Sequence, residues 1–156
     1  MSFDIEKDWT TAAGFRAVVI RRHNRNRCGY VGVPPEHPLH GVAYYEASPC
    51  LRPLTDDEPI GKRGVLALLA YSKEEGLRPD IAFDVHGSLT FAGDGDYPVE
   101  NDGLWWFGFD CNHSGDASTP EEDGRHGNIY RSLEYCVDEC ESLARQLVER
   151  VETVPS

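Results

Sequence analysis

Four polar side chains that could bind a ligand or a metal ion stand in two short segments of the sequence. His86 follows an alternating apolar segment, and Asp110, His113 and Asp116 follow an aromatic one. Carboxylates and imidazoles are common ligands of divalent metals such as Zn²⁺, Mn²⁺ or Fe²⁺, and a bound ion lowers the pKa of water enough to drive hydrolysis. The spacing matches no standard metal signature. One interpretation is a polar functional site. The other is a structural role, in which the carboxylates cap a turn and the histidines form hydrogen bonds with backbone groups.

The segment 80–86 predicts how His86 is positioned. Its apolar and polar residues alternate, which is typical of a strand with one buried face. Asp84 and His86 would then lie together on the face away from the core, so Asp84 joins the candidate metal ligands. The polar groups after the aromatic segment matter for such a site only if His86 faces them.

The aromatic segment 104–110 also alternates. Every second residue falls on one face, which we expect in the core: Trp105, Phe107 and Phe109. On the other face Trp106 could stack on a nucleobase, Gly108 would leave an open floor, and Asp110 would accept a hydrogen bond. The alternative is that both faces are buried and Trp106 belongs to the core.

An arginine cluster supplies a candidate anion site. Arg21, Arg22, Arg25 and Arg27 follow one another closely in an otherwise acidic chain. Guanidinium groups bind phosphate through two parallel hydrogen bonds. We expect Arg21 and Arg25 at a solvated hairpin tip and keep Arg22 and Arg27 as candidate ligand-binding residues.

The apolar patterns before residue 80 predict two strands and a short helix. Segments 15–20 and 28–33 read as strands, and the asparagines between them favour a hairpin. Residues 65–75 begin apolar, end charged and are followed by Gly76, which predicts a short helix with a glycine C-cap.

The clearest helix is predicted at the C-terminal end. Over residues 129–151 apolar side chains recur at three- and four-residue steps, and Asn128 precedes them as a suitable N-cap. Cys136 and Cys140 lie on this apolar stripe and are expected in the core. Together with the strands, this helix predicts one α+β domain over residues 1–156, with a largely antiparallel sheet packed by the long helix.

Charge and cysteine content narrow the functional class. The chain has 27 acidic against 15 basic residues and a formal net charge of −12. This balance disfavours general nucleic-acid binding, because phosphate contacts need a basic surface. Five cysteines without C-x-x-C spacing, no signal-peptide pattern and no apolar stretch of about 18 residues predict a protein of the cytoplasm with no membrane association. Cys111 and His113 could also pair as nucleophile and base.

Several segments give the chain a family resemblance that covers about half of it. They are Cys28–Pro34, His37–Gly41, His86–Phe91, Trp105–Asp116 and Tyr130–Leu147. In these segments the chain resembles a family of small, uncharacterised proteins encoded by phages and prophages. The resemblance implies a small accessory protein that acts in the host cytoplasm, with counter-defence as one role: binding or degrading a host signalling nucleotide.

Three functions follow from these observations. The leading one is binding of a small, nucleotide-like ligand in a polar and aromatic pocket formed by His86, Trp106, Asp110, His113, Asp116, Arg22 and Arg27. The first alternative is a small metal-dependent hydrolase that uses His86, Asp110, His113 and Asp116 as metal ligands, with Asp84. The second is a virion or host-protein interaction module that acts through its acidic surface.

Overall fold

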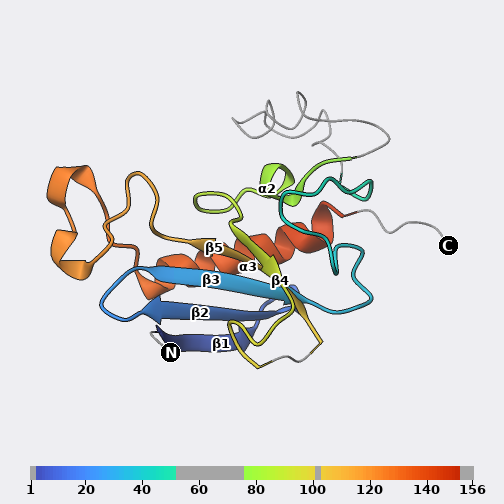
Figure 1. Ribbon diagram of the computed structural model, residues 1–156, viewed down its shortest axis with the longest axis horizontal. Helices are drawn as coiled ribbons and strands as arrows, with labels where there is room; N and C mark the ends of the chain where they lie inside the picture. Colours follow the sequence, from blue (N-terminus) through green and yellow to red (C-terminus); the bar gives the residue numbers. More distant parts are fainter. Residues whose placement is uncertain (1–2, 52–75, 101–102, 152–156) are drawn as a thin grey trace.

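Five antiparallel strands form one sheet in the order β1-β2-β3-β5-β4 (Figure 1). The computed structural model describes residues 3–51, 76–100 and 103–151. The strands are β1 (Phe3–Thr10), β2 (Arg16–Arg22), β3 (Arg27–Val33), β4 (Phe91–Gly93) and β5 (Trp105–Asp110). Helix α3 (Leu133–Glu149) packs against the sheet. The predicted α+β class, with an antiparallel sheet and a long C-terminal helix, is confirmed.

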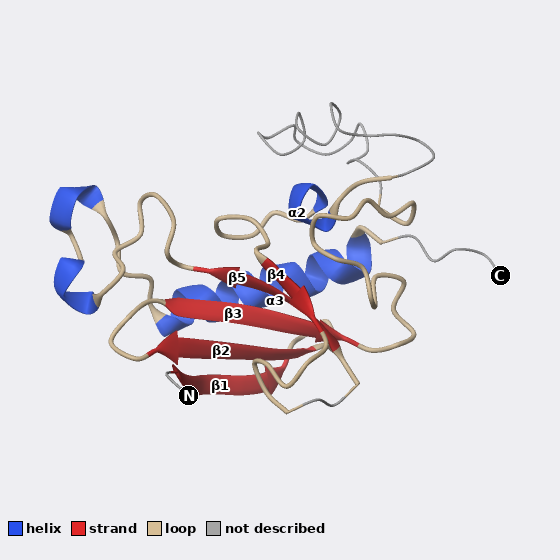
Figure 2. Cartoon of the chain, viewed as in Figure 1, coloured by secondary structure: helices blue, strands red, loops and turns tan. Residues whose placement is uncertain are grey.

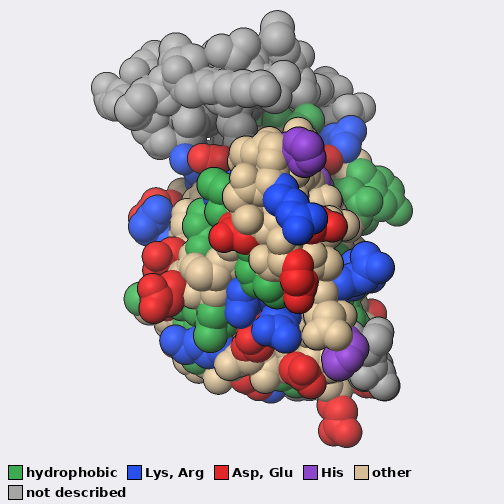
Figure 3. Space-filling model, turned by 90° about the vertical axis from the view of Figure 1, so that its left-hand side faces the viewer, with side chains coloured by type: hydrophobic (Ala, Val, Ile, Leu, Met, Phe, Trp, Pro, Cys, Tyr) green, Lys and Arg blue, Asp and Glu red, His purple; other side chains and the backbone are tan. Residues whose placement is uncertain are grey.

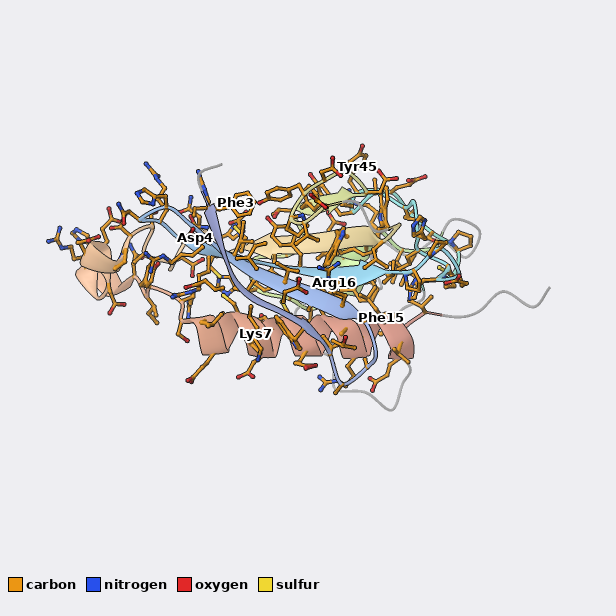
Figure 4. The ribbon with its side chains drawn as sticks, turned by 90° about the horizontal axis from the view of Figure 1, so that it is seen from below. Phe3, Asp4, Lys7, Phe15, Arg16 and Tyr45 are labelled. Atoms are coloured by element: carbon orange, nitrogen blue, oxygen red, sulfur yellow. The ribbon has the colours of Figure 1, made fainter. Side chains whose placement is uncertain are left out.

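The two apolar faces of the sheet are both covered, which makes a core on each side. The larger core lies between the sheet and α3 and includes Val19, Val31 and Phe107. The smaller core lies on the opposite face and includes Tyr30 and Trp106. Figure 4, seen from below, shows α3 on one side of the sheet and loop segments on the other.

Helix α3 starts later than the apolar pattern predicted. Asn128 is not its N-cap, because the chain at Ile129 is still extended: its N–H donates to the Gly115 carbonyl at 2.9 Å. The cap is Ser132, whose side-chain oxygen accepts from the Tyr135 N–H at 3.1 Å. The apolar stripe itself is confirmed. It buries Cys136, Cys140, Leu143, Ala144 and Leu147.

Glycines and aromatic residues face each other across β3 and β5. Tyr30 pairs with Gly108, and Gly29 pairs with Phe109. A Cβ at Gly108 would lie 2.4 Å from the Tyr30 ring, and one at Gly29 would lie 2.4 Å from the Phe109 ring. Each glycine therefore leaves the space that the ring on the neighbouring strand fills.

The hairpin prediction is confirmed, but the strand predicted over 80–86 is wrong. In the β2–β3 turn, Asn24 has a φ of 55°, the left-handed conformation that asparagine tolerates. Residues Pro79–Ala82 form a short helix, α2, because proline at the first helical position fixes a helical φ. The inward and outward alternation does hold beyond it: Phe83 and Val85 are buried.

Two short 3-10 helices, Pro120–Glu122 and Arg125–Gly127, lie in the arm between β5 and α3 (Figure 2). The arm closes where Asp116 and Ile129 pair in a parallel bridge. The helix predicted over 65–75 lies outside the described residues. Within the part of the chain that the structure describes, no helix has the length and apolar character needed to cross a membrane.

Candidate functional site

A pocket of about 400 Å³ lies beside the end of β5, on the side of the sheet that carries Cys28 and Tyr30. Its wall combines the β2–β3 hairpin, β4 and the turn after β5. The lining includes Arg22, Asn26, Tyr30, Phe91, Tyr97, Asp110 and His113. Three of the residues predicted to bind a ligand, Arg22, Asp110 and His113, therefore line one cavity.

Three aromatic rings form one wall of this pocket. Tyr30 packs edge-on against Phe91 and Tyr97, with ring centroids 5.5 and 5.3 Å apart. The Tyr30 and Tyr97 hydroxyls lie 2.5 Å apart in a hydrogen bond. Burial raises the pKa of both phenols, so both stay protonated at neutral pH. The wall is apolar over the ring faces and carries neutral hydroxyls at its edge.

Asp110 and His113 form the polar end of the pocket. Asp110 accepts hydrogen bonds from the Thr90 hydroxyl at 3.2 Å and from the Asn112 N–H at 3.1 Å. The His113 Nε2 lies 3.0 Å from Asp110 Oδ1. That approach lacks hydrogen-bond geometry, and Nε2 is buried without a hydrogen-bond partner among the described residues. The His113 ring lies over Gly87, where a Cβ would come within 2.3 Å of it.

A second buried polar atom of the pocket lining also lacks a partner. Asn26 is 2% exposed, and its Nδ2 donates to the Arg27 carbonyl at 3.2 Å. Its Oδ1 accepts no hydrogen bond from any described residue. A buried carbonyl oxygen without a donor costs about 1–3 kcal/mol. The pocket therefore contains an acceptor, on Asn26, and a ring nitrogen, on His113, that a bound molecule could satisfy.

Arg22 lies exposed at the rim of the pocket. Within the described ranges it has no carboxylate partner. Burial raises the pKa of Tyr97, and the charge of Arg22 opposes that rise, so the guanidinium acts electrostatically on the pocket wall. Figure 3 faces the end of the molecule that carries the 112–130 arm, where acidic and basic side chains are interspersed. Anion binding here depends on individual arginines rather than on a broad basic field.

A separate network joins His86 and Asp116, as the sequence predicted, and adds Tyr135 and Arg131. His86 Nε2 lies 2.7 Å from Asp116 Oδ2, and His86 Nδ1 lies 2.7 Å from the Tyr135 hydroxyl. The Arg131 Nε donates to Asp116 Oδ1 at 2.8 Å. Because the carboxylate can only accept, Nε2 carries the imidazole proton and Nδ1 accepts from the tyrosine.

Asp116 is the most deeply buried member of this network, with a side chain 0% exposed. Burial alone would raise its pKa, but hydrogen bonds from His86, from Arg131 and from the His113 N–H outweigh burial and hold the pKa below its usual value. Glu139, which accepts from the His86 N–H at 2.7 Å, has its pKa raised by burial. The network therefore has one carboxylate held ionised, and another whose charged form is disfavoured.

Trp106 and Arg27 do not line the pocket. Trp106 is 0% exposed in the smaller core, so its ring has no face free for a ligand, and the core alternative is correct. The Tyr30 ring occupies the space above Gly108 that was expected to be an open floor. Arg27 forms an ion pair with Glu6 at 2.5 Å and donates to the Arg131 carbonyl at 2.9 Å, so it joins β1 and β3 to the segment just before α3.

The arrangement does not favour the metal hypothesis. Among the residues that the structure describes, no group of three or more His, Cys, Asp or Glu side chains is arranged to hold a metal ion. Asp116 already binds His86 and the guanidinium of Arg131, and that positive charge would repel a cation. Asp84 is anchored through its backbone, since its N–H and carbonyl both bond the Gln146 amide.

Cys111 is unsuited to the role of nucleophile. Its thiol lies 3.5 Å from that of Cys136, and both residues are buried. The hydrogen bond with Cys136 and burial raise its pKa far above the ordinary value, so the thiolate is not formed at neutral pH.

Sequence reasoning did not identify Tyr135, Arg131 or the aromatic wall. Arg131 lies just before the α3 cap and Tyr135 in its first turn, with the Arg131 guanidinium 5.0 Å above the Tyr135 ring. Their four-residue spacing within the predicted helix 129–151 was the available signal, because residues four apart share one side of a helix. A search of protein-family models, curated proteins and solved structures found no match to this chain.

Proposed function

We propose that this protein binds a small anionic ligand with an aromatic ring, of the size of a nucleoside monophosphate, in the pocket beside β5. The observation that carries the proposal is the combination of a rim arginine, an aromatic wall and two buried polar atoms without partners in one cavity. A volume of about 400 Å³ is at the small end of the range of small-molecule sites, which suits a single nucleotide.

Each part of a nucleotide has a matching group in the pocket. Arg22 suits the phosphate, because a guanidinium can donate two parallel hydrogen bonds to its oxygens. Phe91 and Tyr97 offer ring surface to the base, and base–aromatic contacts contribute about 1–3 kcal/mol in nucleic-acid binders. The Asn26 carbonyl can accept from an amino or imino group of the base.

The resemblance to phage-encoded proteins supports a biological setting for this proposal. In that setting the protein acts in the host cytoplasm, and its ligand is a host signalling nucleotide that the protein sequesters.

The test is calorimetric titration of the full-length protein with AMP, GMP, CMP and UMP. Adenosine, which lacks phosphate, and ribose 5-phosphate, which lacks a base, should each bind more weakly than AMP. Arg22→Gln should weaken binding about 10- to 100-fold, as expected for one lost charge-assisted contact. His113→Ala should also weaken it.

Arg25→Gln is the matched control. Arg25 is exposed in the same turn, carries the same charge and is outside the pocket lining. It should bind as the wild type does. Saturable binding by none of these nucleotides at millimolar concentration would refute the proposal, and so would equal affinity of the two arginine variants.

A further inference from the structure

The Asp116–His86–Tyr135 network has the geometry of a nucleophile, a base and an orienting carboxylate. The Tyr135 hydroxyl is 2.7 Å from His86 Nδ1, and His86 Nε2 is 2.7 Å from the buried Asp116 carboxylate. Both distances are within hydrogen-bond reach, which is the first requirement for such a set. This network is independent of the pocket, whose lining includes none of the three residues.

Three separate parts of the chain fix this geometry. His86 lies in the loop after α2, where Glu139 holds its backbone N–H. Asp116 lies at the base of the arm, where the Arg131 Nε and the His113 N–H hold its carboxylate. Tyr135 lies in the first turn of α3. The imidazole therefore has one partner on each nitrogen, and its orientation is set from both sides.

Arg131 supplies a positive charge over the face of the Tyr135 ring. Its guanidinium lies 5.0 Å above the Tyr135 ring and donates from Nε to Asp116. Within the described residues its two Nη groups have no hydrogen-bond partner. The Arg131 side chain is 22% exposed and that of His86 is 12% exposed, so solvent reaches both. An anionic oxygen brought to the Tyr135 hydroxyl would meet free guanidinium donors.

We propose that Tyr135 is a nucleophile that reacts with phosphoryl-type electrophiles, with His86 as its base and Asp116 as the positioning carboxylate. The Tyr135 oxygen forms a bond to phosphorus while the bond from phosphorus to the leaving group breaks. The hydroxyl proton moves to His86 Nδ1, and the leaving group departs with the bonding electrons. Arg131 stabilises the negative charge on the phosphoryl oxygens.

The state of the hydroxyl fits this order of events. Burial raises the pKa of Tyr135, and the nearby Glu139 charge adds to the rise, so the phenol is neutral at neutral pH. It becomes a nucleophile only as His86 takes its proton. The ionisable groups around His86 are Asp116 and Tyr135 on its ring, Glu139 on its N–H, Arg131 across the carboxylate, and the His113 ring 6.4 Å away.

The test is labelling of the full-length protein with a fluorophosphonate, which forms a stable phosphonyl ester and releases fluoride. Peptide mapping by mass spectrometry then compares Tyr135 with Tyr45. Tyr45 is 63% exposed (labelled in Figure 4) and is the internal control for an unassisted tyrosine. Tyr135 should react at least about tenfold faster than Tyr45, although it is less exposed.

Variants separate this role from a structural one. Tyr135→Phe should abolish the product at that site, and His86→Gln should reduce Tyr135 labelling to the rate of Tyr45.

Two outcomes would overturn the proposal, and one of them needs no variant. The first is a wild-type protein in which Tyr45 reacts as fast as Tyr135. The second is a His86→Gln protein that is folded by circular dichroism and labels Tyr135 at the wild-type rate. Either result would leave the network with a structural role only.

Discussion

Replacing Asp116 with asparagine should destabilise the protein by about 2–3 kcal/mol. The carboxylate accepts hydrogen bonds from His86 Nε2 at 2.7 Å, Arg131 Nε at 2.8 Å and the His113 N–H at 3.0 Å. An amide of the same shape keeps one oxygen and turns an NH₂ group towards another donor. Each hydrogen bond to a charged group contributes about 1.5–3 kcal/mol, so the loss of one accounts for the expected change.

The assay is urea unfolding at neutral pH, followed by circular dichroism. In thermal unfolding without urea, a loss of about 2–3 kcal/mol should lower the melting temperature of a chain of this length by about 5–10 °C. Asp94→Asn is the matched control, because Asp94 is exposed and the same charge is removed. It should change the free energy of unfolding by less than about 0.5 kcal/mol. An Asp116→Asn protein as stable as the Asp94→Asn protein would refute the reasoning.

The pH dependence of this difference is a further check. The pKa of Asp116 is lower in the folded protein than its ordinary value of 3.8. The unfolded chain therefore binds a proton more readily, and the stabilisation by Asp116 is complete above that value and is lost as the pH falls through the folded pKa. The stability gap between wild type and Asp116→Asn should narrow in acid. A gap that stays constant below pH 3.8 would contradict this.

Three further predictions concern the scaffold. His37 donates from Nε2 to the Leu147 carbonyl and accepts from the Leu39 N–H, and burial lowers its pKa below 6.5. Its stabilisation is therefore present above that pH and lost below it. Between about pH 7 and about pH 5, the free energy of unfolding of His37→Gln should fall by less than that of the wild type. An equal fall in both proteins, measured by urea unfolding, would contradict this. Gly29→Ala should cost about 1–3 kcal/mol, because its Cβ would lie 2.4 Å from the Phe109 ring, whereas Gly95→Ala, with open space around it, should be neutral. Equal melting temperatures of these two variants would refute the glycine–aromatic pairing. Ser132→Ala should cost about 1 kcal/mol through loss of the α3 cap, and an unchanged urea midpoint would show that the cap contributes nothing.

Local sequence patterns predicted correctly the elements whose buried residues are determined by the apolar pattern within the element itself. The strands around Val18 and Val31 form where their apolar segments predicted them, and the stripe of α3 buries the residues that its three- and four-residue steps select. The strand predicted over 80–86 failed because Pro79 starts a helical turn there, and a single turn is too short to show a helical period. The start of α3 moved because Ile129 pairs with the arm, a contact between distant residues that no local pattern contains.

The candidate site was predicted in part, for the same reason. His86 and Asp116 do meet, but their partners Arg131 and Tyr135 come from the start of α3 and the residues just before it, where the sequence pattern misplaced the helix boundary. For Trp106 the core was already the more frequent role of a tryptophan, but the alternation of the segment alone did not exclude a pocket wall, and the smaller core decides between them. The smaller core forms because the β4–β5 connection packs on that face of the sheet, where the Tyr97 and Tyr30 ring centroids lie 5.3 Å apart.

A crystal structure of the protein soaked with AMP tests the central claim most directly. We expect the phosphate to contact Arg22, the adenine to lie against Phe91 and Tyr97, and the Asn26 Oδ1 to gain a hydrogen-bond donor. Density for the nucleotide at any other place on the protein, or an empty pocket in crystals soaked at a concentration that saturates binding in solution, would contradict it.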